Sequence, residues 1–305
     1  MSLLETRTAP GAGSPAVAPG RFARWIGPLS WATLVANILI VVTGGAVRLT
    51  GSGLGCPTWP QCTDRGYTPH GELNIHSAIE FGNRMLTFVL VAIAVATVVA
   101  AWSTKRRDLR FLAIGIALGI PAQAIIGGIT VLTDLNPWLV SLHLMLSMVM
   151  VALAVLLLRL LPGPLPARRS GPVVTLAWVT FAAAWVVLYL GTVVTGSGPH
   201  AGDENSPRNG LDPVHTSQLH ADAVMLFVGL CVGLLVLAMV LDDPAARRAG
   251  LVLLGVNIVQ AAIGFVQYFT GLPVVLVGLH MLGAGVLTAA ITWVVLSLRH
   301  PVRVG

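Results

Sequence analysis

Three histidines lie within long apolar stretches of the chain, where an ionisable side chain is costly and usually serves a function. They are His143, His220 and His280. Two neutral imidazoles on facing helices are suited to the two axial positions of a haem iron. We therefore predict that His220 and His280 bind a haem. The alternative for each of them is a core histidine that is hydrogen-bonded between helices.

The stretch around His280 is repeated within the chain. The segment that begins at Gln260, QAAIGFVQYFTGLPVVLVGLHMLGAG, aligns with the segment that begins at Gln123, QAIIGGITVLTDLNPWLVSLHLMLSM, and His143 takes the place of His280. Each copy is typical of two apolar helices joined by a tight turn that contains proline. We therefore predict a duplication with one histidine at the same place in each half.

The first half lacks the second histidine of this pattern. The offset between the two copies leads from His220 to Asn83, which shares one helical face with His76 and Glu80. A carboxylate beside a haem site is a candidate base or cation stabiliser, and the alternative role of Glu80 is a salt bridge to Arg84. We predict that the first half binds the substrate and that the second half holds a permanent cofactor.

Long membrane helices must position these side chains. Apolar residues make up 55% of the chain and charged residues 10%, whereas soluble domains have about 25% charged residues. A helix needs about 20 apolar residues to cross a membrane core. Such runs are expected at roughly 26–47, 76–101, 111–133, 137–160, 172–195, 215–240, 249–270 and 273–298. The predicted fold class is an all-α membrane protein with eight transmembrane helices, arranged as two pseudo-symmetric four-helix bundles.

The distribution of charge predicts the orientation in the membrane. The formal net charge of +6 is also typical of proteins that bind nucleic acid. The basic residues are instead concentrated in the two tails and in alternate loops, which is the positive-inside pattern. We expect a multi-pass protein of the cell membrane, surrounded by lipid, with both termini cytoplasmic and no nucleic acid partner.

The chain is expected to divide into four parts. Residues 1–24 are rich in small residues and proline and are predicted to form a disordered cytoplasmic tail. The first four-helix half, with the substrate site, spans residues 25–161. A cytoplasmic linker spans residues 162–171, and the second half, with the cofactor site, spans residues 172–299.

The predicted external loop after the first helix contains the sequence GCPTWPQC. Cys56 and Cys62 would face an oxidising compartment there, so we predict a disulfide, with two roles open: a structural staple or an exchangeable bond. Cys231 lies in the middle of the sixth apolar stretch and is expected to be a packing residue.

Three polar residues near the outer helix ends are candidates for contacts with haem propionates: Arg48, Arg84 and His215. The alternative for Arg48 is to extend its guanidinium to the membrane surface. The alternative for His215 is a place in interfacial water.

The chain resembles the haem A synthase family over residues 25–298. The resemblance rests on VTGGAVRLTGSGLGCPTWPQC after the first helix, on IEFGNR in the second helix, and on the histidines of the fourth, sixth and eighth helices. It implies an oxidoreductase that converts the C8 methyl group of haem O into the formyl group of haem A for cytochrome c oxidase, in two-electron steps with water as the oxygen source. The alternative is a di-haem b-type membrane electron-transfer protein, which would have two histidine ligands in each half.

The resemblance also implies roles for single residues. Glu80 matches the essential glutamate of the family, expected near the methyl group as a base or a stabiliser of positive charge. His143 matches the histidine that binds the substrate haem. His220 and His280 match the two ligands of a resident haem b.

Further matches concern the loop and the remaining position. Cys56 and Cys62 match the cysteine pair of the first loop. Asn83 stands where the family pattern has a histidine, which leaves His143 alone or a rearranged ligand such as His76 for the substrate haem. Candidate partners are haem O synthase and cytochrome c oxidase assembly factors, and a homo-oligomer is also left open.

Overall fold

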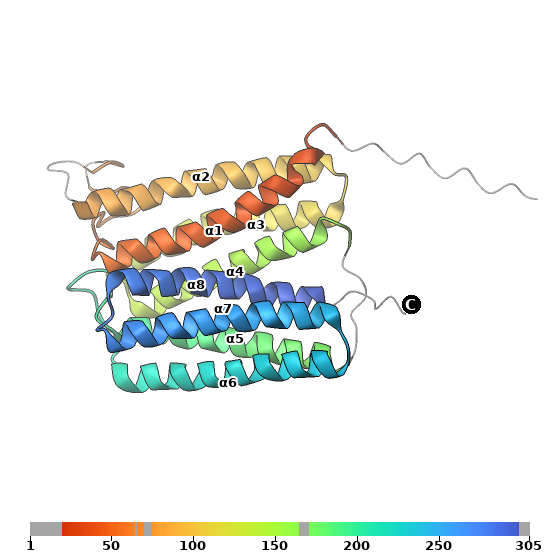
Figure 1. Cartoon of the computed structure of the whole chain (residues 1–305). Coiled ribbons are helices and arrows are strands. Elements are labelled where there is room, and N and C mark those ends of the chain that lie inside the picture. Colours follow the sequence, from red (N-terminus) through yellow and green to blue (C-terminus); the bar gives the residue numbers. More distant parts are fainter. Residues whose placement is uncertain (1–19, 65, 70–74, 165–170, 299–305) are drawn as a thin grey trace, which may run out of the picture.

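The computed structural model describes residues 20–64, 66–69, 75–164 and 171–298. These residues form eight long helices, as the apolar runs predict (Figure 1). The helices are α1 (Ile26–Leu49), α2 (Ile75–Ser103), α3 (Arg107–Leu132), α4 (Pro137–Leu160), α5 (Pro172–Ser197), α6 (Pro213–Val240), α7 (Pro244–Phe269) and α8 (Val274–Ser297). All eight are long and apolar enough to cross a membrane.

Parts of the predicted tail and linker lie outside the described residues, namely 1–19 and 165–170. Within the part of the tail that is described, a short 3-10 helix, η1 (Ala23–Trp25), leads into α1. The C-terminal residues 299–305 also lie outside the described part of the chain.

Proline and an acidic or amide cap fix where several helices begin. Pro137 opens α4 after Asn136, whose side chain accepts a hydrogen bond from the amide of Trp138. Pro213 opens α6 after Asp212, whose side chain accepts from the amides of Val214 and His215. Proline suits the first helical position because the missing N–H has no intrahelical partner there, and the cap satisfies the amides that follow. These caps set the heights of the histidines that follow on each helix.

Two helices begin earlier than the hydropathy predicts. The start of α7 is Pro244 rather than a residue near 249, because Asp243 caps it by accepting from the amides of Ala245 and Ala246. The start of α3 is Arg107 rather than a residue near 111. Charged residues can belong to the first turn of a membrane helix when that turn lies in the polar interface.

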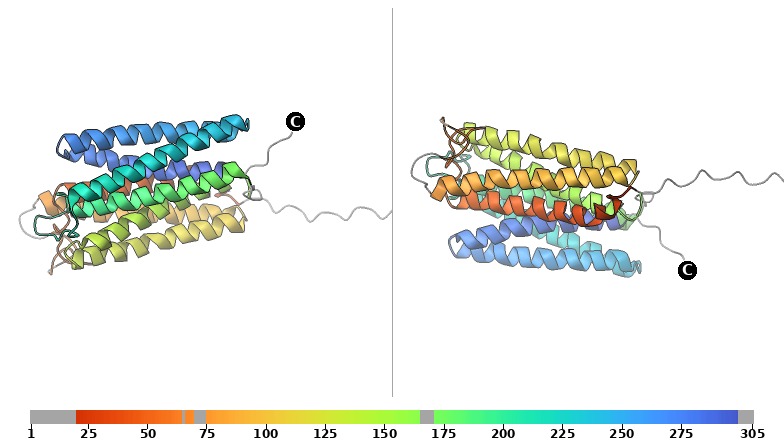
Figure 2. Two further views of the ribbon diagram at one scale, coloured as in Figure 1. Left: turned by 90° about the horizontal axis from the view of Figure 1, so that it is seen from below. Right: turned by 90° about the horizontal axis from the view of Figure 1, so that it is seen from above.

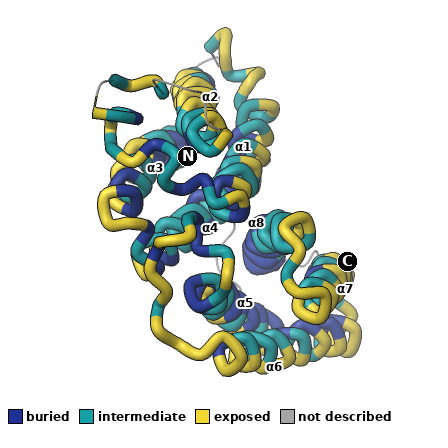
Figure 3. Tube along the Cα trace, turned by 90° about the vertical axis from the view of Figure 1, so that its left-hand side faces the viewer, coloured by how far each residue is buried: buried dark blue, intermediate teal, exposed yellow. Residues whose placement is uncertain are grey.

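For description, α1 to α4 are called the first group of helices and α5 to α8 the second group. Along the chain α1 to α4 contact one another in sequence and α1 contacts α4; the same contacts recur among α5 to α8. Figure 3 shows the two groups along the helix axes, and Figure 2 shows them from two sides. The helix α8 joins the groups by contacting α1 and α4, and α4 contacts α5. The division into two four-helix bundles and a pseudo-twofold relation between them stay predictions.

Each group has its own apolar core. Phe227, Leu253 and Ile291 belong to a buried cluster of the second group. A separate cluster fills the first group, and a third cluster lies between the groups on α1, α4 and α8. Cys231 is a free thiol, fully buried in the second core, as predicted for a packing residue.

Candidate functional site

The three intramembrane histidines lie in one layer near the end of the bundle at which α4, α6 and α8 begin. His143 is the seventh residue of α4, His220 the eighth of α6 and His280 the seventh of α8. At about 1.5 Å per residue, each lies about 10 Å from the first residue of its helix. The similar distance of each histidine from the start of its helix therefore brings all three imidazoles to a similar depth.

Each of these imidazole rings packs against a glycine of the preceding helix. A Cβ atom on that glycine would lie 3.1–3.3 Å from the Cε1 atom of the ring, closer than side chains ordinarily pack. The pairs are Gly127 with His143, Gly191 with His220, and Gly264 with His280. Only glycine leaves the ring this much room, so these residues help to fix the position of each imidazole.

Each of the three histidines also has an unpaired ring nitrogen. Among the described residues, the buried Nδ1 atoms of His143, His220 and His280 have no hydrogen-bond partner. A buried polar atom without a partner costs about 1–3 kcal/mol, so it calls for an explanation. His220 and His280 are also close enough to interact electrostatically. Such imidazoles, on opposite helices of one group, fit a haem iron bound between them.

The two copies of the repeat share a glutamine contact. The Nε2 atom of Gln260 donates to the backbone carbonyl oxygen of His280 over 2.7 Å, and that of Gln123 donates to the carbonyl oxygen of His143 over 3.3 Å. The glycines opposite these histidines, Gly264 and Gly127, are related by the same sequence offset. The two copies of the repeat therefore share this pair of contacts between neighbouring helices.

Asn83, the ninth residue of α2, stands where the offset of the repeat places the equivalent of His220. The Oγ1 atom of Thr43 donates to its Oδ1 atom over 2.8 Å, and a Cβ on Gly44 would lie 3.9 Å from its Nδ2 atom. A glycine of the preceding helix thus lies beside Asn83 as well, but less closely than beside the three histidines.

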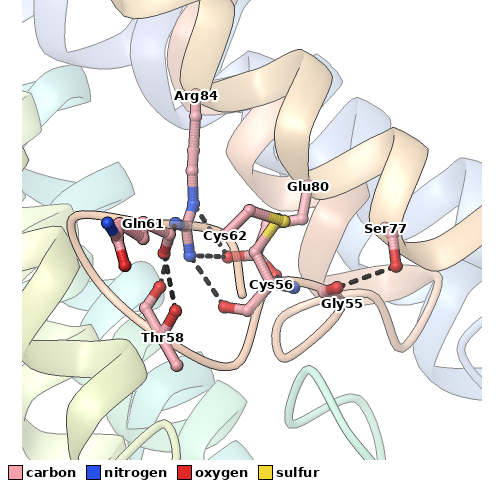
Figure 4. The surroundings of a disulfide bond; sticks show 8 residues. All are labelled: Gly55, Cys56, Thr58, Gln61, Cys62, Ser77, Glu80 and Arg84. Atoms are coloured by element: carbon pink, nitrogen blue, oxygen red, sulfur yellow. Dashed lines mark hydrogen bonds and ion pairs between the residues drawn. A yellow bond between two sulfur atoms is a disulfide. The ribbon is translucent and has the colours of Figure 1, made fainter. Parts of the chain in front are cut away.

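The disulfide loop is tied to α2 through Glu80 and Arg84. Cys56 and Cys62 form the predicted disulfide. Glu80 is buried, with an exposed fraction of 5%. Its Oε2 atom accepts a hydrogen bond from the backbone amide of Cys56 over 2.7 Å. Its Oε1 atom accepts from the Nη2 and Nε atoms of Arg84 over 2.5 Å and 3.1 Å. Arg84 also donates to the carbonyl oxygens of Cys56, Thr58 and Gln61 (Figure 4).

Both oxygen atoms of Glu80 therefore have partners in this structure. The salt bridge to Arg84, which the sequence allowed as the alternative role, is formed. The sequence showed the four-residue spacing of the pair, but the carbonyl contacts of Arg84 depend on the path of the loop. The carboxylate and the guanidinium together hold the loop against the outer part of α2.

The loop also covers the outer part of α3. The ring of Trp59 packs against Gly128, so closely that a Cβ at this position would overlap the ring. The neighbouring residue, Gly127, faces His143. Sequence reasoning missed Trp59, and the signals for it were the adjacent glycines on α3 and an aromatic residue between two prolines in the loop.

The remaining predicted residues, His76, Arg48 and His215, lie near the outer ends of their helices. The Nδ1 atom of His76 is 2.9 Å from the hydroxyl of Ser52. Arg48 donates to the carbonyl oxygens of His200 and Thr195, and so connects α1 to the last turn of α5 and to the loop that follows it. His215 is largely exposed, with its Nδ1 atom 3.8 Å from the carboxylate of Asp212.

Asp212 itself is a capping residue. Hydrogen bonds from the backbone amides of His215 and Val214 stabilise its charged form and lower the pKa of its carboxyl group. The local contacts of His215 thus belong to the start of α6. A contact of Arg48, Arg84 or His215 with a propionate stays a prediction.

The fold and the site define a class of protein: a multi-pass helical membrane protein with three histidines in one layer, each with a buried Nδ1 atom. Residues 28–78 and 70–210 match the family model described as cytochrome oxidase assembly protein. The chain belongs to this family.

Several relatives of the chain are named Heme A synthase. The one from Bacillus pumilus (strain SAFR-032) is 35% identical over 137 residues, which cover 44% of this chain and 43% of the relative. The one from Lysinibacillus sphaericus (strain C3-41) is 30% identical over 187 residues, 57% of this chain and 58% of the relative. The chain thus matches about half the length of these relatives.

A further relative matches over more of the chain, at a lower sequence identity. The Heme A synthase of Staphylococcus epidermidis (strain ATCC 35984) is 23% identical over 300 residues, which cover 90% of this chain and 97% of the relative. This similarity extends over both helix groups.

Proposed function

We propose that this protein is a haem A synthase, which oxidises the C8 methyl group of haem O to a formyl group and so provides haem A for cytochrome c oxidase. One observation carries the proposal: His143, His220 and His280 lie in one layer, each against a glycine and each with an unpaired buried nitrogen. The relatives named Heme A synthase support the choice of substrate.

The proposed reaction is an oxidation in two two-electron steps. Water provides the formyl oxygen, and the methyl group and water together release four protons and four electrons. The electrons pass to an acceptor outside the chain. The residues of this chain have to bind the haem, orient its methyl group and accept protons near it.

In the second group, we assign His220 and His280 as the ligands of a resident haem b. The residues fit this cofactor, because the two imidazoles come from opposite helices of one group and have unpaired nitrogens. A haem b held there supplies one-electron transfer when it is bound. Gly191 and Gly264 leave room for the rings, and Gln260 holds the backbone of His280.

In the first group, we assign His143 as the residue that binds the substrate haem. Glu80 is the proposed catalytic carboxylate, acting as a base or as a stabiliser of positive charge near the methyl group. Its pairing with Arg84 favours the charged form of the carboxylate, whereas its burial opposes that form. The disulfide loop, with Trp59 seated on α3, shields the outer end of this group from water.

The outer surface of the helices fits a protein that lies in a membrane. Large apolar side chains are exposed along the helices, among them Phe111, Val240 and Phe269, and they would face lipid. A membrane location with both termini cytoplasmic fits these features. Haem O synthase and the oxidase assembly factors stay candidate partners.

The proposal is tested by haem extraction from a host that makes haem O but lacks haem A synthase. Expression of this chain should produce haem A, measured by chromatography of the extracted haems, and His143→Ala should abolish it. Accumulation of haem b-loaded protein together with haem O, and without any haem A, would exclude the proposed activity.

A further inference from the structure

The two helix groups place different side chains at equivalent corners. In the second group, His220 on α6 and His280 on α8 lie on helices that are separated by α5 and α7. In the first group, the offset of the repeat makes Asn83 on α2 equivalent to His220, and His143 on α4 equivalent to His280. A haem bound at His143 would by this equivalence have Asn83 on its other side, at the place that a second imidazole would take in the second group.

The contacts of Asn83 make it a donor and not an iron ligand. Its Oδ1 atom accepts the hydroxyl hydrogen of Thr43 over 2.8 Å, and this contact sets the orientation of the amide. The Nδ2 group that remains has two N–H bonds and no lone pair that can bind a metal. It lies on the side of Gly44, where no larger side chain fills the space.

Nearby residues do not replace the lost imidazole. His76 lies seven residues before Asn83 on α2, which places it about 10 Å nearer the outer end of the helix, and it is bonded to Ser52. Glu80 lies one turn before Asn83, and both of its oxygen atoms contact Arg84 or the amide of Cys56.

We propose that the substrate haem is bound by His143 alone, that its opposite face is open to a small ligand, and that the Nδ2 group of Asn83 donates a hydrogen bond to that ligand. The inference rests on the proposed function, which places the substrate haem at His143. It gives the two groups different coordination chemistry: an open site in the first and a closed, two-histidine site in the second. Access and hydrogen-bond donors on the open face decide what such a haem can bind.

Carbon monoxide is the probe for the open face, because it binds ferrous haem only at a free or weakly held axial position. The full-length protein, purified and reconstituted with haemin, is reduced with dithionite and titrated with carbon monoxide. We expect one carbon monoxide-binding haem per chain, lost in His143→Ala, beside a second haem that stays low-spin. A haem that depends on His143, is low-spin when reduced and binds no carbon monoxide would overturn the inference.

Variants of Asn83 separate the open face from the hydrogen bond. Asn83→His should supply the missing imidazole, make the first haem low-spin and abolish most carbon monoxide binding. Asn83→Leu should keep the binding but speed dissociation by about fivefold to tenfold, the ratio expected for the loss of one hydrogen bond of about 1 kcal/mol. Unchanged binding and dissociation in both variants would show that Asn83 does not face the haem.

His76→Ala is the control for a rearranged ligand. It should leave the haem content and the carbon monoxide binding unchanged; a new or larger carbon monoxide-binding fraction in this variant would identify His76 as the second ligand and overturn the inference. Haem A formation is measured separately in the same proteins. A protein that binds carbon monoxide at His143 but makes no haem A refutes the proposed activity alone, whereas haem A formation without such binding refutes the open face alone.

Discussion

Arg84 donates two hydrogen bonds to the carboxylate of Glu80. Its other N–H groups donate to three carbonyl oxygens of the disulfide loop. The proposed catalytic carboxylate is thus also an anchor for the loop. Removing one member of a buried ion pair leaves the other charge unpaired, at a cost of several kcal/mol. A loss of structure can therefore imitate a loss of catalysis, and the two have to be measured apart.

Substitution of Glu80 by Gln keeps the shape of the side chain and removes its charge. If the carboxylate acts on the substrate, Glu80→Gln should lower haem A formation by more than about tenfold per unit of haem b-loaded protein, which corresponds to at least about 1.4 kcal/mol in the barrier. The measurement is the ratio of haem A to haem b in the purified variant.

Arg84→Gln is the matched control, because it breaks the same ion pair from the other side. We expect it to lower the amount of protein and its haem b content more than Glu80→Gln does, since Arg84 holds three loop carbonyls. Normal haem A formation by Glu80→Gln, per unit of haem b, would exclude Glu80 from the chemistry.

The second prediction concerns the disulfide. Cys56 and Cys62 are joined and Cys231 is free. Protein that is denatured without reduction should take up one thiol label, at Cys231, and reduction should add labels at Cys56 and Cys62. Mass spectrometry of the labelled peptides gives the positions. Labels on all three cysteines before reduction, in protein taken from the membrane without reductant, would show that no stable bond is present.

The third prediction concerns the resident haem. His220→Ala and His280→Ala should each remove the low-spin absorbance of haem b, because a haem needs both imidazoles to be low-spin in this site. Each variant should still be recovered as folded membrane protein, since the apolar core of the second group is unchanged. A full low-spin spectrum in both variants would show that the ligands lie elsewhere.

The sequence predicted the helices well because the thickness of the membrane dictates their length. The expected and observed bounds agree within a few residues, except where Arg107 and Pro244 begin their helices one turn early. The repeat also predicted that His143 and His280 are equivalent, and their glutamine contacts agree.

The sequence alone did not predict the contacts between side chains of different helices. The pairing of Gly191 with His220 depends on how α5 and α6 are aligned, and hydropathy does not set that alignment. The packing of Trp59 against Gly128 similarly depends on how the loop between α1 and α2 folds. Spacing along one helix did predict the pair of Glu80 and Arg84, because residues four apart share a face.

The last prediction tests the glycines that face the histidines. Gly264→Ala adds a methyl group that would lie 3.1 Å from the Cε1 atom of His280, so the ring or the helix must move. We expect the haem b content to fall by about fivefold or more, which corresponds to about 1 kcal/mol, the lower end of the cost of overpacking a core. Haem b per protein is measured by absorbance, and the midpoint potential of the remaining haem is measured by redox titration.

Gly255→Ala, on the same helix, is the matched control because no atom lies within 4 Å of its added methyl group. Alanine favours a helix over glycine by about 1 kcal/mol in both variants, so the backbone effect is the same and slightly stabilising. A merely structural fault in α7 would lower the amount of protein in both variants. Displacement of His280 should instead leave the protein amount similar, with less haem b and a shifted midpoint potential in Gly264→Ala only. Equal haem b content and equal potentials in the two variants would show that Gly264 has no part in positioning the histidine.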